Sequence, residues 1–257
     1  MRITVLASGS KGNCALVSGG DGDLLVDCGL PAREALSRLS TAGGSHDALR
    51  GILVTHEHVD HIRGVRALAR ALQVPVYGTG GTLLDLSGSA ARGHVPSLHR
   101  VLPSARFELG GFGIVPFPTS HDAREPCGFF IGEDGFRFAF CTDTGCLSPS
   151  LVAELSRCDG ILLEGNHCPE MLAKGPYPES LKRRIRSRRG HLSNAAAASC
   201  LREIASGPGA VILAHLSEVN NTPGKALASA TEALGFYLGE VELLVAAQHQ
   251  VSASISL

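Results

Sequence analysis

The sequence lacks several features that would assign it to a protein class at once. Its 257 residues contain no apolar run close to the roughly 18 residues that cross a membrane, and its N-terminus is too short and strand-like for a signal peptide. The eight cysteines form no Cys-x-x-Cys pair. The net charge is −1, so no overall basic field indicates nucleic acid, and any basic surface must be local. We therefore expect a cytoplasmic protein whose cysteines are reduced thiols.

The composition is that of an ordinary globular protein. Apolar residues make up 44% of the chain and charged residues 18%, and the chain is long enough to bury a large core. We expect a single domain that covers residues 1–257. Two of the cysteines, Cys28 and Cys168, lie beside polar clusters, so the sequence leaves a metal-binding role open for each.

The most informative stretch places His56, His58, Asp60 and His61 within six residues. It follows the apolar residues 51–54, which predict a buried strand, and it precedes a predicted helix. The stretch therefore lies on a loop at a strand end, where α/β proteins place their chemistry. His56 and His58 project to the same side of an extended segment, while Asp60 and His61 can face a second point. Imidazole and carboxylate are ligands that zinc and manganese accept.

Hydrophobic patterns predict the surrounding elements. Strands are expected at 3–6, 15–17, 24–26, 51–54, 75–77, 112–117, 129–131, 136–140, 161–163, 210–214, 241–245 and 250–255, and helices at 31–39 and 65–72. Asp27 ends the third strand, where it either forms a turn or braces the histidine loop, and the sequence leaves both open. His94 and His99 fall in polar connections and are expected on the surface.

Five predicted strands end in a residue of the metal-binding type. These residues are His56, His121, Asp143, His167 and His215. Strand ends on one edge of a sheet converge, so residues far apart in the sequence can meet there. Each residue alone is compatible with a buried, hydrogen-bonded histidine or a turn aspartate. Their shared position favours one site.

With these motifs in this order, the chain resembles the metallo-β-lactamase superfamily over nearly its whole length. The matching residues are Asp27, His56, His58, Asp60, His61, His121, Asp143 and His215. The resemblance implies an α/β (α+β) fold, a four-layer αββα sandwich of two facing sheets with helices outside. It also implies a two-metal site on one edge of the sandwich.

Within that superfamily the chain is most similar to the YycJ (WalJ) group, whose members are described as DNA exonucleases or phosphodiesterase-like hydrolases. The matching segments are residues 8–13, 164–167, 190–194, 215–217 and 220–223. One departure is Gly165, where relatives usually carry serine. The long insertion of β-CASP relatives and the flexible arm of tRNA 3′-processing relatives are not expected.

The resemblance also implies a ligand set and a cofactor. His56, His58 and His121 would bind one metal ion. Asp60, His61 and His215 would bind the second, and Asp143 would bridge the two. The cofactor would be two divalent ions, zinc or manganese with iron as a further option, about 3.5–4 Å apart and sharing an activated water.

Three residues are candidates for catalysis: Asp60, His167 and His191. His191 either donates a proton to the leaving oxygen or holds the scissile phosphate, or it only fixes the start of a helix near Ser193 and Asn194. His167 either contacts phosphate or braces a ligand. The sequence leaves these alternatives open.

Six of the eight residues 182–189 are basic and none is acidic. The candidate phosphate contacts among them are Lys182, Arg183, Arg184, Arg186 and Arg188. A charge run is ordinarily a solvated helix face, but this one directly precedes the His191 motif. A near-neutral protein that concentrates positive charge there is expected to bind a polyanion, with DNA favoured over RNA.

Three other functions are weighed against a nuclease. Hydrolysis of a small cyclic phosphodiester or nucleotide would use the same site, with the basic run incidental. Thioester or lactam hydrolysis is disfavoured by Asp60 and by the basic run. Diiron electron transfer is disfavoured because 257 residues leave no room for a flavodoxin-like module, and because His58 and His121 stand where those proteins usually carry an acidic residue.

Overall fold

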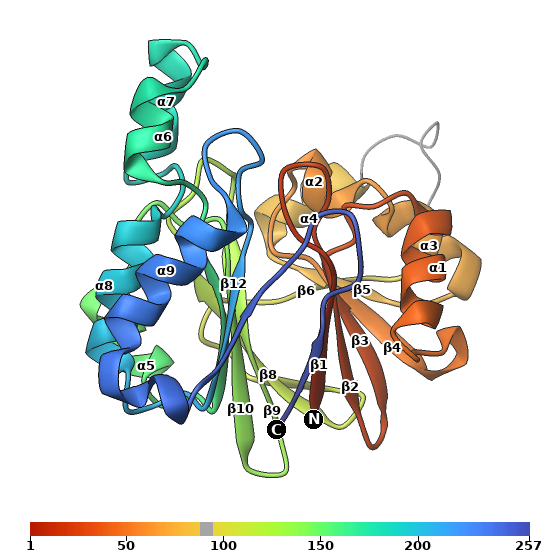
Figure 1. Cartoon of the computed structure of the whole chain (residues 1–257). Coiled ribbons are helices and arrows are strands. Elements are labelled where there is room, and N and C mark those ends of the chain that lie inside the picture. Colours follow the sequence, from red (N-terminus) through yellow and green to blue (C-terminus); the bar gives the residue numbers. More distant parts are fainter. Residues whose placement is uncertain (88–94) are drawn as a thin grey trace. The chain divides into compact units, whose positions relative to one another are not determined.

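The structure is a computed structural model that describes residues 1–87 and 95–257 (Figure 1). The prediction for His94 therefore concerns a residue outside the described part. The chain divides into two compact units. The first comprises Met1–Pro118, Ala123–Gly135 and Ala247–Leu257, and the second comprises Thr119–Asp122 and Phe136–Ala246. The expectation of a single domain stays a prediction.

A seven-stranded sheet forms the centre of the first unit. Its strands, in spatial order, are β14 (Ser254–Ser256), β1 (Arg2–Ala7), β2 (Cys14–Gly19), β3 (Gly22–Val26), β4 (Leu49–Leu53), β5 (Val76–Gly78) and β6 (Leu98–Arg100). The strands from β14 to β3 are antiparallel to their neighbours, and those from β3 to β6 are parallel. Because β3 and β4 are parallel, Asp27 and the histidine loop follow them at the same sheet edge.

Helices and three further strands belong to the described part of the first unit. They are α1 (Ala32–Thr41), η1 (His46–Ala48), α2 (Val59–Ile62), α3 (Val65–Leu72), α4 (Gly80–Ser87), β7 (Phe107–Leu109), β8 (Phe112–Pro118) and β9 (Cys127–Glu133). Figure 1 shows α1 and α3 lying side by side along this sheet. Ala35 and Leu39 of α1 and Leu68 and Ala69 of α3 belong to one buried cluster with sheet residues such as Ile52. Burial of this amphipathic face stabilises the helices against the sheet.

The second unit is built on four parallel strands. These are β10 (Phe136–Cys141), β11 (Gly160–Glu164), β12 (Ala210–Ala214) and β13 (Glu242–Val245). All five residues of both β11 and β12 are buried, as expected of interior parallel strands. Asp143, His167 and His215 follow three neighbouring strands, so these side chains leave the same edge of the sheet.

Five helices and a short 3₁₀ helix belong to the second unit. They are α5 (Pro149–Leu155), α6 (Pro169–Lys174), α7 (Glu179–Arg186), α8 (Asn194–Ile204), α9 (Pro223–Leu234) and η3 (Gly235–Gly239). Figure 1 shows α8 and α9 packed side by side, with α6 and α7 projecting beyond them. None of the helices in the described part of the chain is long and apolar enough to cross a membrane.

Most predicted elements are confirmed, with two differences. The last strand covers only Ser254–Ser256 rather than 250–255, because the backbone of residues 250–253 leaves the regular ladder. The histidine loop contains a short helix, α2, where a bend was expected. The N–H groups of His61 and Ile62 donate to the carbonyl of His58, which winds Asp60 and His61 into this turn. His99 is exposed, as predicted.

Candidate metal centre

The histidine loop of the first unit gathers three imidazole rings. The ring centroid of His56 lies 4.6 Å from that of His58 and 4.1 Å from that of His61. His56 and His61 are buried, whereas His58 and Asp60 are half-buried. Four residues predicted as ligands therefore lie together on one loop.

Asp27 braces this loop, which answers the question that the sequence left open. Its Oδ2 accepts the Nδ1–H of His61 at 2.7 Å and the hydroxyl of Thr55 at 2.9 Å, and its Oδ1 accepts the N–H of Thr55 at 2.8 Å. A carboxylate accepts only, so the proton of His61 resides on Nδ1. This leaves Nε2 as the nitrogen with a lone pair, the form in which histidine binds metal.

Thr55 and Asn13 orient the rest of the loop. The Thr55 hydroxyl donates to Asp27 and therefore accepts the Nδ1–H of His56 at 3.0 Å, so His56 also carries its lone pair on Nε2. The Nδ2 of Asn13 lies 3.0 Å from Nε2 of His61 and 3.3 Å from Oδ2 of Asp60. The amide orientation of Asn13 is set by its Oδ1, which accepts the N–H of Gly9 at 2.8 Å.

A second set of donors lies in the second unit. Donor atoms of Asp143, Glu164, His191 and His215 all lie within 4.8 Å of one another. His121 belongs to the same neighbourhood, since its Nε2 lies 3.7 Å from Oδ1 of Asp143. The structure thus brings together, within this unit, the predicted residues from three strand ends.

Glu164 is the centre of this second set. Its Oε1 accepts the Nδ1–H of His191 at 2.7 Å and that of His215 at 3.0 Å, and its Oε2 accepts the N–H groups of Thr144 and Leu192. Burial alone would raise the pKa of Glu164, but the charge of His191 and the bonds from both rings outweigh it and lower the pKa to about 2. Glu164 is therefore a buried carboxylate.

His121 is fixed in the same way by a backbone carbonyl. Its Nδ1–H donates to the carbonyl of Gly190 at 3.0 Å, which leaves Nε2 toward Asp143. Burial lowers the pKa of His121, and the negative charge of Asp143 only partly offsets this effect. The neutral imidazole that a metal ion requires is thereby favoured.

Three of the residues around these donors hold strained backbone conformations. Asp27, Asp143 and His215 have φ angles of 60°, 52° and 56°, in the left-handed region that non-glycine residues rarely adopt. Such strain costs about 1–3 kcal/mol per residue and persists where surrounding contacts enforce it, typically at functional sites. The three strained residues follow β3, β10 and β12 within two positions of the strand end.

The donor sets fit divalent metal ions. His56, His61, His121 and His215 each place a proton on Nδ1 and a lone pair on Nε2, and buried carboxylates accompany them. Hydrogen-bonded imidazoles beside carboxylates are the ligand chemistry of zinc, manganese and iron sites. Within the described residues no such cluster includes a cysteine, and all eight cysteines are free thiols. The metal roles left open for Cys28 and Cys168 find no support.

His191 and His167 occupy different surroundings. His191 does not cap α8, because Ser193 is the capping residue and its Oγ accepts the N–H of Ala196 at 3.1 Å. Burial lowers the pKa of His191, but the charge and hydrogen bond of Glu164 outweigh it and raise the pKa. His167 is buried, and within the described chain its Nδ1 has no hydrogen-bond partner. Burial lowers the pKa of His167 to about 4.

The basic run requires one correction. Lys182 was predicted to contact phosphate, but it is buried, and its ammonium donates to the carbonyl of Ala173 at 2.8 Å and pairs with Glu179. It anchors α7 because its long apolar stem packs inward from the helix. Arg183, Arg184, Arg186 and Arg188 are exposed, and Arg184 pairs with Asp122.

Two residues of the site were not singled out from the sequence. Glu164 carried a usable signal, a charged residue that ends the otherwise apolar strand β11. Asn13 lies in the matching segment 8–13, but nothing in that segment indicates a role for its side chain, because a small-residue turn contains polar side chains for many reasons. The departure at Gly165 needs no special role. A Cβ added there would meet only Oδ1 of Asn194, at 3.6 Å, which is ordinary contact.

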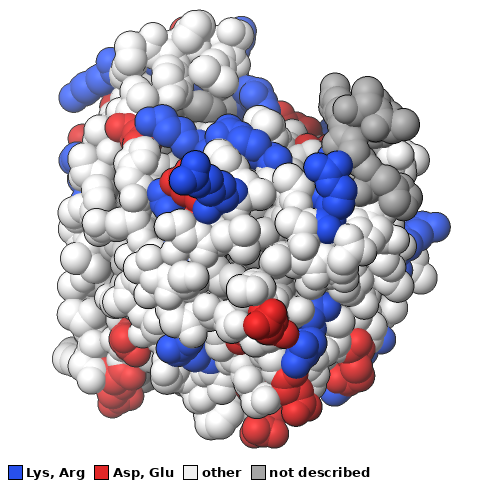
Figure 2. All heavy atoms as spheres, turned by 90° about the vertical axis from the view of Figure 1, so that its right-hand side faces the viewer, with Lys and Arg blue, Asp and Glu red and all other residues white. Residues whose placement is uncertain are grey.

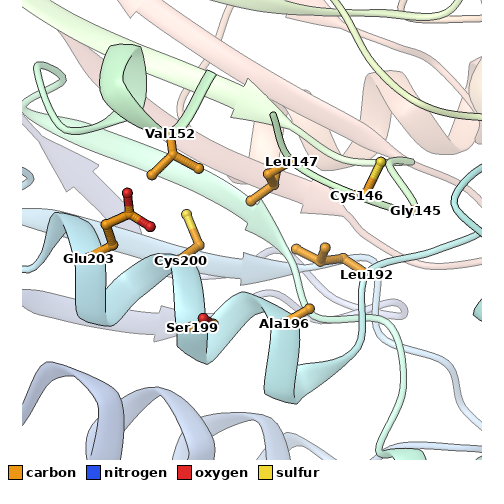
Figure 3. A pocket seen from close by; sticks show the side chains of 9 residues that line it. All are labelled: Gly145, Cys146, Leu147, Val152, Leu192, Ala196, Ser199, Cys200 and Glu203. Atoms are coloured by element: carbon orange, nitrogen blue, oxygen red, sulfur yellow. The ribbon is translucent and has the colours of Figure 1, made fainter. Parts of the chain in front are cut away.

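A pocket of about 270 Å³ lies apart from the donors, between α5, α8 and residues 145–147 of the second unit (Figure 3). Figure 3 shows Cys200 and Glu203 projecting from α8 toward Val152 of α5. None of the predicted site residues lines this pocket. It is therefore not the centre at which the histidines and carboxylates meet.

Comparison with known proteins places these sites in a family. Residues 23–216 match the family model described as a β-lactamase superfamily domain. The chain is 35% identical over 246 residues to exodeoxyribonuclease YycJ of Bacillus anthracis, covering 93% of this chain and 92% of that protein. It is 37% identical over 227 residues to exodeoxyribonuclease WalJ of Streptococcus pneumoniae, covering 86% and 83%.

A solved structure confirms the fold. The metallo-β-lactamase fold protein YhfI from Bacillus subtilis matches with a TM-score of 0.75 at 20% identity, covering 98% of this chain and 99% of that one. The predicted α/β sandwich and the resemblance to the YycJ and WalJ group are both confirmed. The chain thus belongs to the β-lactamase superfamily and is a metal-dependent hydrolase of the metallo-β-lactamase fold.

Proposed function

We propose that this protein is a dinuclear metal-dependent phosphodiesterase that degrades nucleic acid, most closely in the manner of a DNA exonuclease. The observation that carries the proposal is the similarity to two exodeoxyribonucleases over more than four-fifths of the chain. The donor sets described above support it, because hydrolysis of a phosphodiester is a reaction to which paired metal ions are suited.

The proposed ligands are those that the family resemblance implied. By that resemblance, His56, His58 and His121 would hold one ion, Asp60, His61 and His215 would hold the other, and Asp143 would serve both. The fixed imidazole tautomers support this assignment. When bound, the ions supply an activated water and positive charge for the phosphate oxygens. Zinc and manganese both suit the donor set, and iron is compatible with it.

The protein's own groups perform the remaining steps. Asp60, whose Oδ2 lies near the amide of Asn13, orients the attacking water. His191, held at Nδ1 by Glu164, donates the proton of its Nε2 to the leaving oxygen. His167 contacts the substrate phosphate in this proposal. A His191→Ala variant that retained both metals and full turnover would contradict the role of His191.

The exposed arginines of α7 and the following residues support a polyanionic substrate. Arg183, Arg186 and Arg188 form no ion pair with the described residues. On the one face drawn in Figure 2, most of the acidic side chains lie near the lower edge, away from the basic side chains of the upper half. Arginines of this kind grip backbone phosphates without reading sequence.

The test uses metal-stripped protein refilled with manganese or zinc. Substrates are 5′-labelled DNA and RNA, single- and double-stranded, beside bis(p-nitrophenyl) phosphate. The inactive variant is Asp143→Ala, and its matched control is Asp134→Ala. Both aspartates have a φ of 52°, but Asp134 is an exposed turn residue. An effect seen in Asp143→Ala but not in Asp134→Ala is therefore caused by loss of the proposed ligand and not by loss of a strained aspartate.

Metal-dependent DNA cleavage, lost in Asp143→Ala and retained in Asp134→Ala, is the expected result. Preferential cleavage of RNA would reassign the nucleic acid. Cleavage of the small ester alone would favour a small cyclic phosphodiester or nucleotide as the substrate. Failure of fully loaded protein to cleave any of these would overturn the proposal.

A further inference from the structure

The arginines after the start of α7 fall into two kinds. The Nε of Arg184 donates to Oδ2 of Asp122 at 2.5 Å, and the Nε of Arg189 donates to the carbonyl of His121 at 3.3 Å. Both therefore contact the loop that carries His121. Arg183 and Arg186, by contrast, make no ion pair in the described part of the chain and project from α7 with their charge in solvent.

Asp122 connects Arg184 to the imidazole of His121. While its Oδ2 accepts from Arg184, its Oδ1 lies 3.4 Å from Nε2 of His121. The opposite nitrogen of the ring, Nδ1, donates to Gly190, four residues past the end of α7. The ring of His121 is thus held at Nδ1 by the basic segment. The carboxylate oxygen that Arg184 orients through Asp122 lies beside the lone pair on Nε2, so the two acceptors face each other as two ligands of one cation would.

The backbone of the basic segment is packed tightly against the same loop. The hydroxyl of Ser120 donates to the carbonyl of Arg188 at 2.6 Å, and the N–H of Gly145 donates to the carbonyl of Ser120 at 2.8 Å. A Cβ added at Gly145 would overlap the backbone of Ser187 and Arg188. The segment is therefore fixed relative to the residues that follow both β8 and β10.

We propose that Arg184 is a positioning residue for the His121 end of the metal centre and acts through Asp122, rather than contacting substrate phosphate. The inference rests on the proposed function only in taking His121 as a metal ligand. A half-exposed ion pair adds little to stability, so its contribution here is the geometry it gives to Asp122. Arg183, Arg186 and Arg188 keep the role of gripping a polyanion.

The test measures metal affinity without any substrate. Stripped wild-type protein and the variants Arg184→Ala, Arg184→Lys and Arg183→Ala compete for zinc with a chelating dye, and thermal unfolding verifies that each is folded. Mutating a residue that orients a metal ligand typically lowers metal affinity by about 10–100-fold. For Arg184→Ala we expect a smaller loss of zinc affinity, roughly three- to tenfold, because the ion pair with Asp122 is partly exposed. Arg184→Lys should recover part of it.

The sign of the effect separates positioning from simple electrostatics. Removing a positive charge near a cation site should by itself strengthen cation binding. Arg183→Ala removes the same charge from the neighbouring helix position and should leave zinc affinity equal or slightly higher. Loss of affinity in Arg184→Ala alone therefore requires a geometric role, and Asp122→Asn combined with it should add little further loss.

Wild-type or stronger zinc affinity in a folded Arg184→Ala protein would overturn the inference. This result does not depend on which substrate is cleaved, so it stands apart from failure of the proposed function. A second measurement follows polynucleotide binding against salt. The plot of the logarithm of the binding constant against the logarithm of the salt concentration should become less steep for Arg183→Ala and keep its steepness for Arg184→Ala. An equal loss of steepness in both variants would show that Arg184 contacts phosphate, as Arg183 does.

Discussion

The carboxylate of Asp27 accepts the ring proton of His61 at 2.7 Å, across 34 residues of sequence. The same carboxylate also holds the backbone and hydroxyl of Thr55, which in turn orients His56. One buried aspartate therefore sets the tautomer of two proposed metal ligands. Its left-handed backbone places the carboxylate where three donors converge.

Asp27→Asn should loosen the histidine loop. An amide has one accepting oxygen, so its NH₂ group would face a donor of Thr55 or His61, and a buried donor would lose its partner. We expect a loss of about 1–3 kcal/mol in the free energy of unfolding and at least tenfold in metal affinity. Denaturant unfolding and dye competition measure the two. Asp21→Asn, at an exposed turn, should change neither.

Gly29→Ala should displace Asp60. A Cβ at Gly29 would overlap the backbone carbonyl of Asp60 and crowd the N–H of Asn13. Overpacking of this kind costs about 1–3 kcal/mol, and here it falls on a proposed ligand. We expect lower thermal stability together with weaker metal binding. Gly20→Ala is the control, because a Cβ there meets nothing within 4 Å. Normal metal binding in a stable Gly29→Ala protein would contradict the tight packing described.

Glu164→Gln should reduce turnover more than substrate binding. The neutral amide no longer favours the protonated form of His191 and accepts its hydrogen bond more weakly. If His191 is the proton donor, kcat should fall by roughly 100-fold, within the range of general acid catalysis. Glu203→Gln, at the exposed end of the α8 pocket, is the matched control. Equal kcat for Glu164→Gln and wild type would show that Glu164 does not contribute to the reaction.

His167 should make folding stability depend on pH in mildly acidic solution. Burial lowers its pKa to about 4 in the folded protein, against about 6.5 when unfolded. The unfolded chain therefore binds more protons between these values, so stability falls as the pH drops from about 6.5 to 4, by up to about 3 kcal/mol. His121, whose pKa is also lowered, acts in the same direction.

The contribution of His167 is isolated by comparing wild type with His167→Gln in metal-free protein. The difference in free energy of unfolding between pH 7 and pH 4.5 should be smaller in the variant. Denaturant titrations at each pH provide both values. Parallel curves for the two proteins would show that His167 titrates normally when folded.

The sequence by itself determined most of the strands and the positions of the proposed ligands. Apolar runs with local periodicity predicted strands such as β11 and β12, and a polar residue directly after each run marked the same sheet edge. The spacing of His56, His58, Asp60 and His61 is also local. Such features depend on neighbours in the chain, so they can be recognised before the fold is known.

Only the tertiary structure decided which groups these residues meet. Glu164 accepts from His191 and His215, which lie 27 and 51 residues away, and Arg184 reaches Asp122 across 62 residues. Lys182 turned inward although its neighbours in the basic run face solvent. Burial and hydrogen-bond partners depend on which distant segments pack together, and no local pattern in the sequence encodes that.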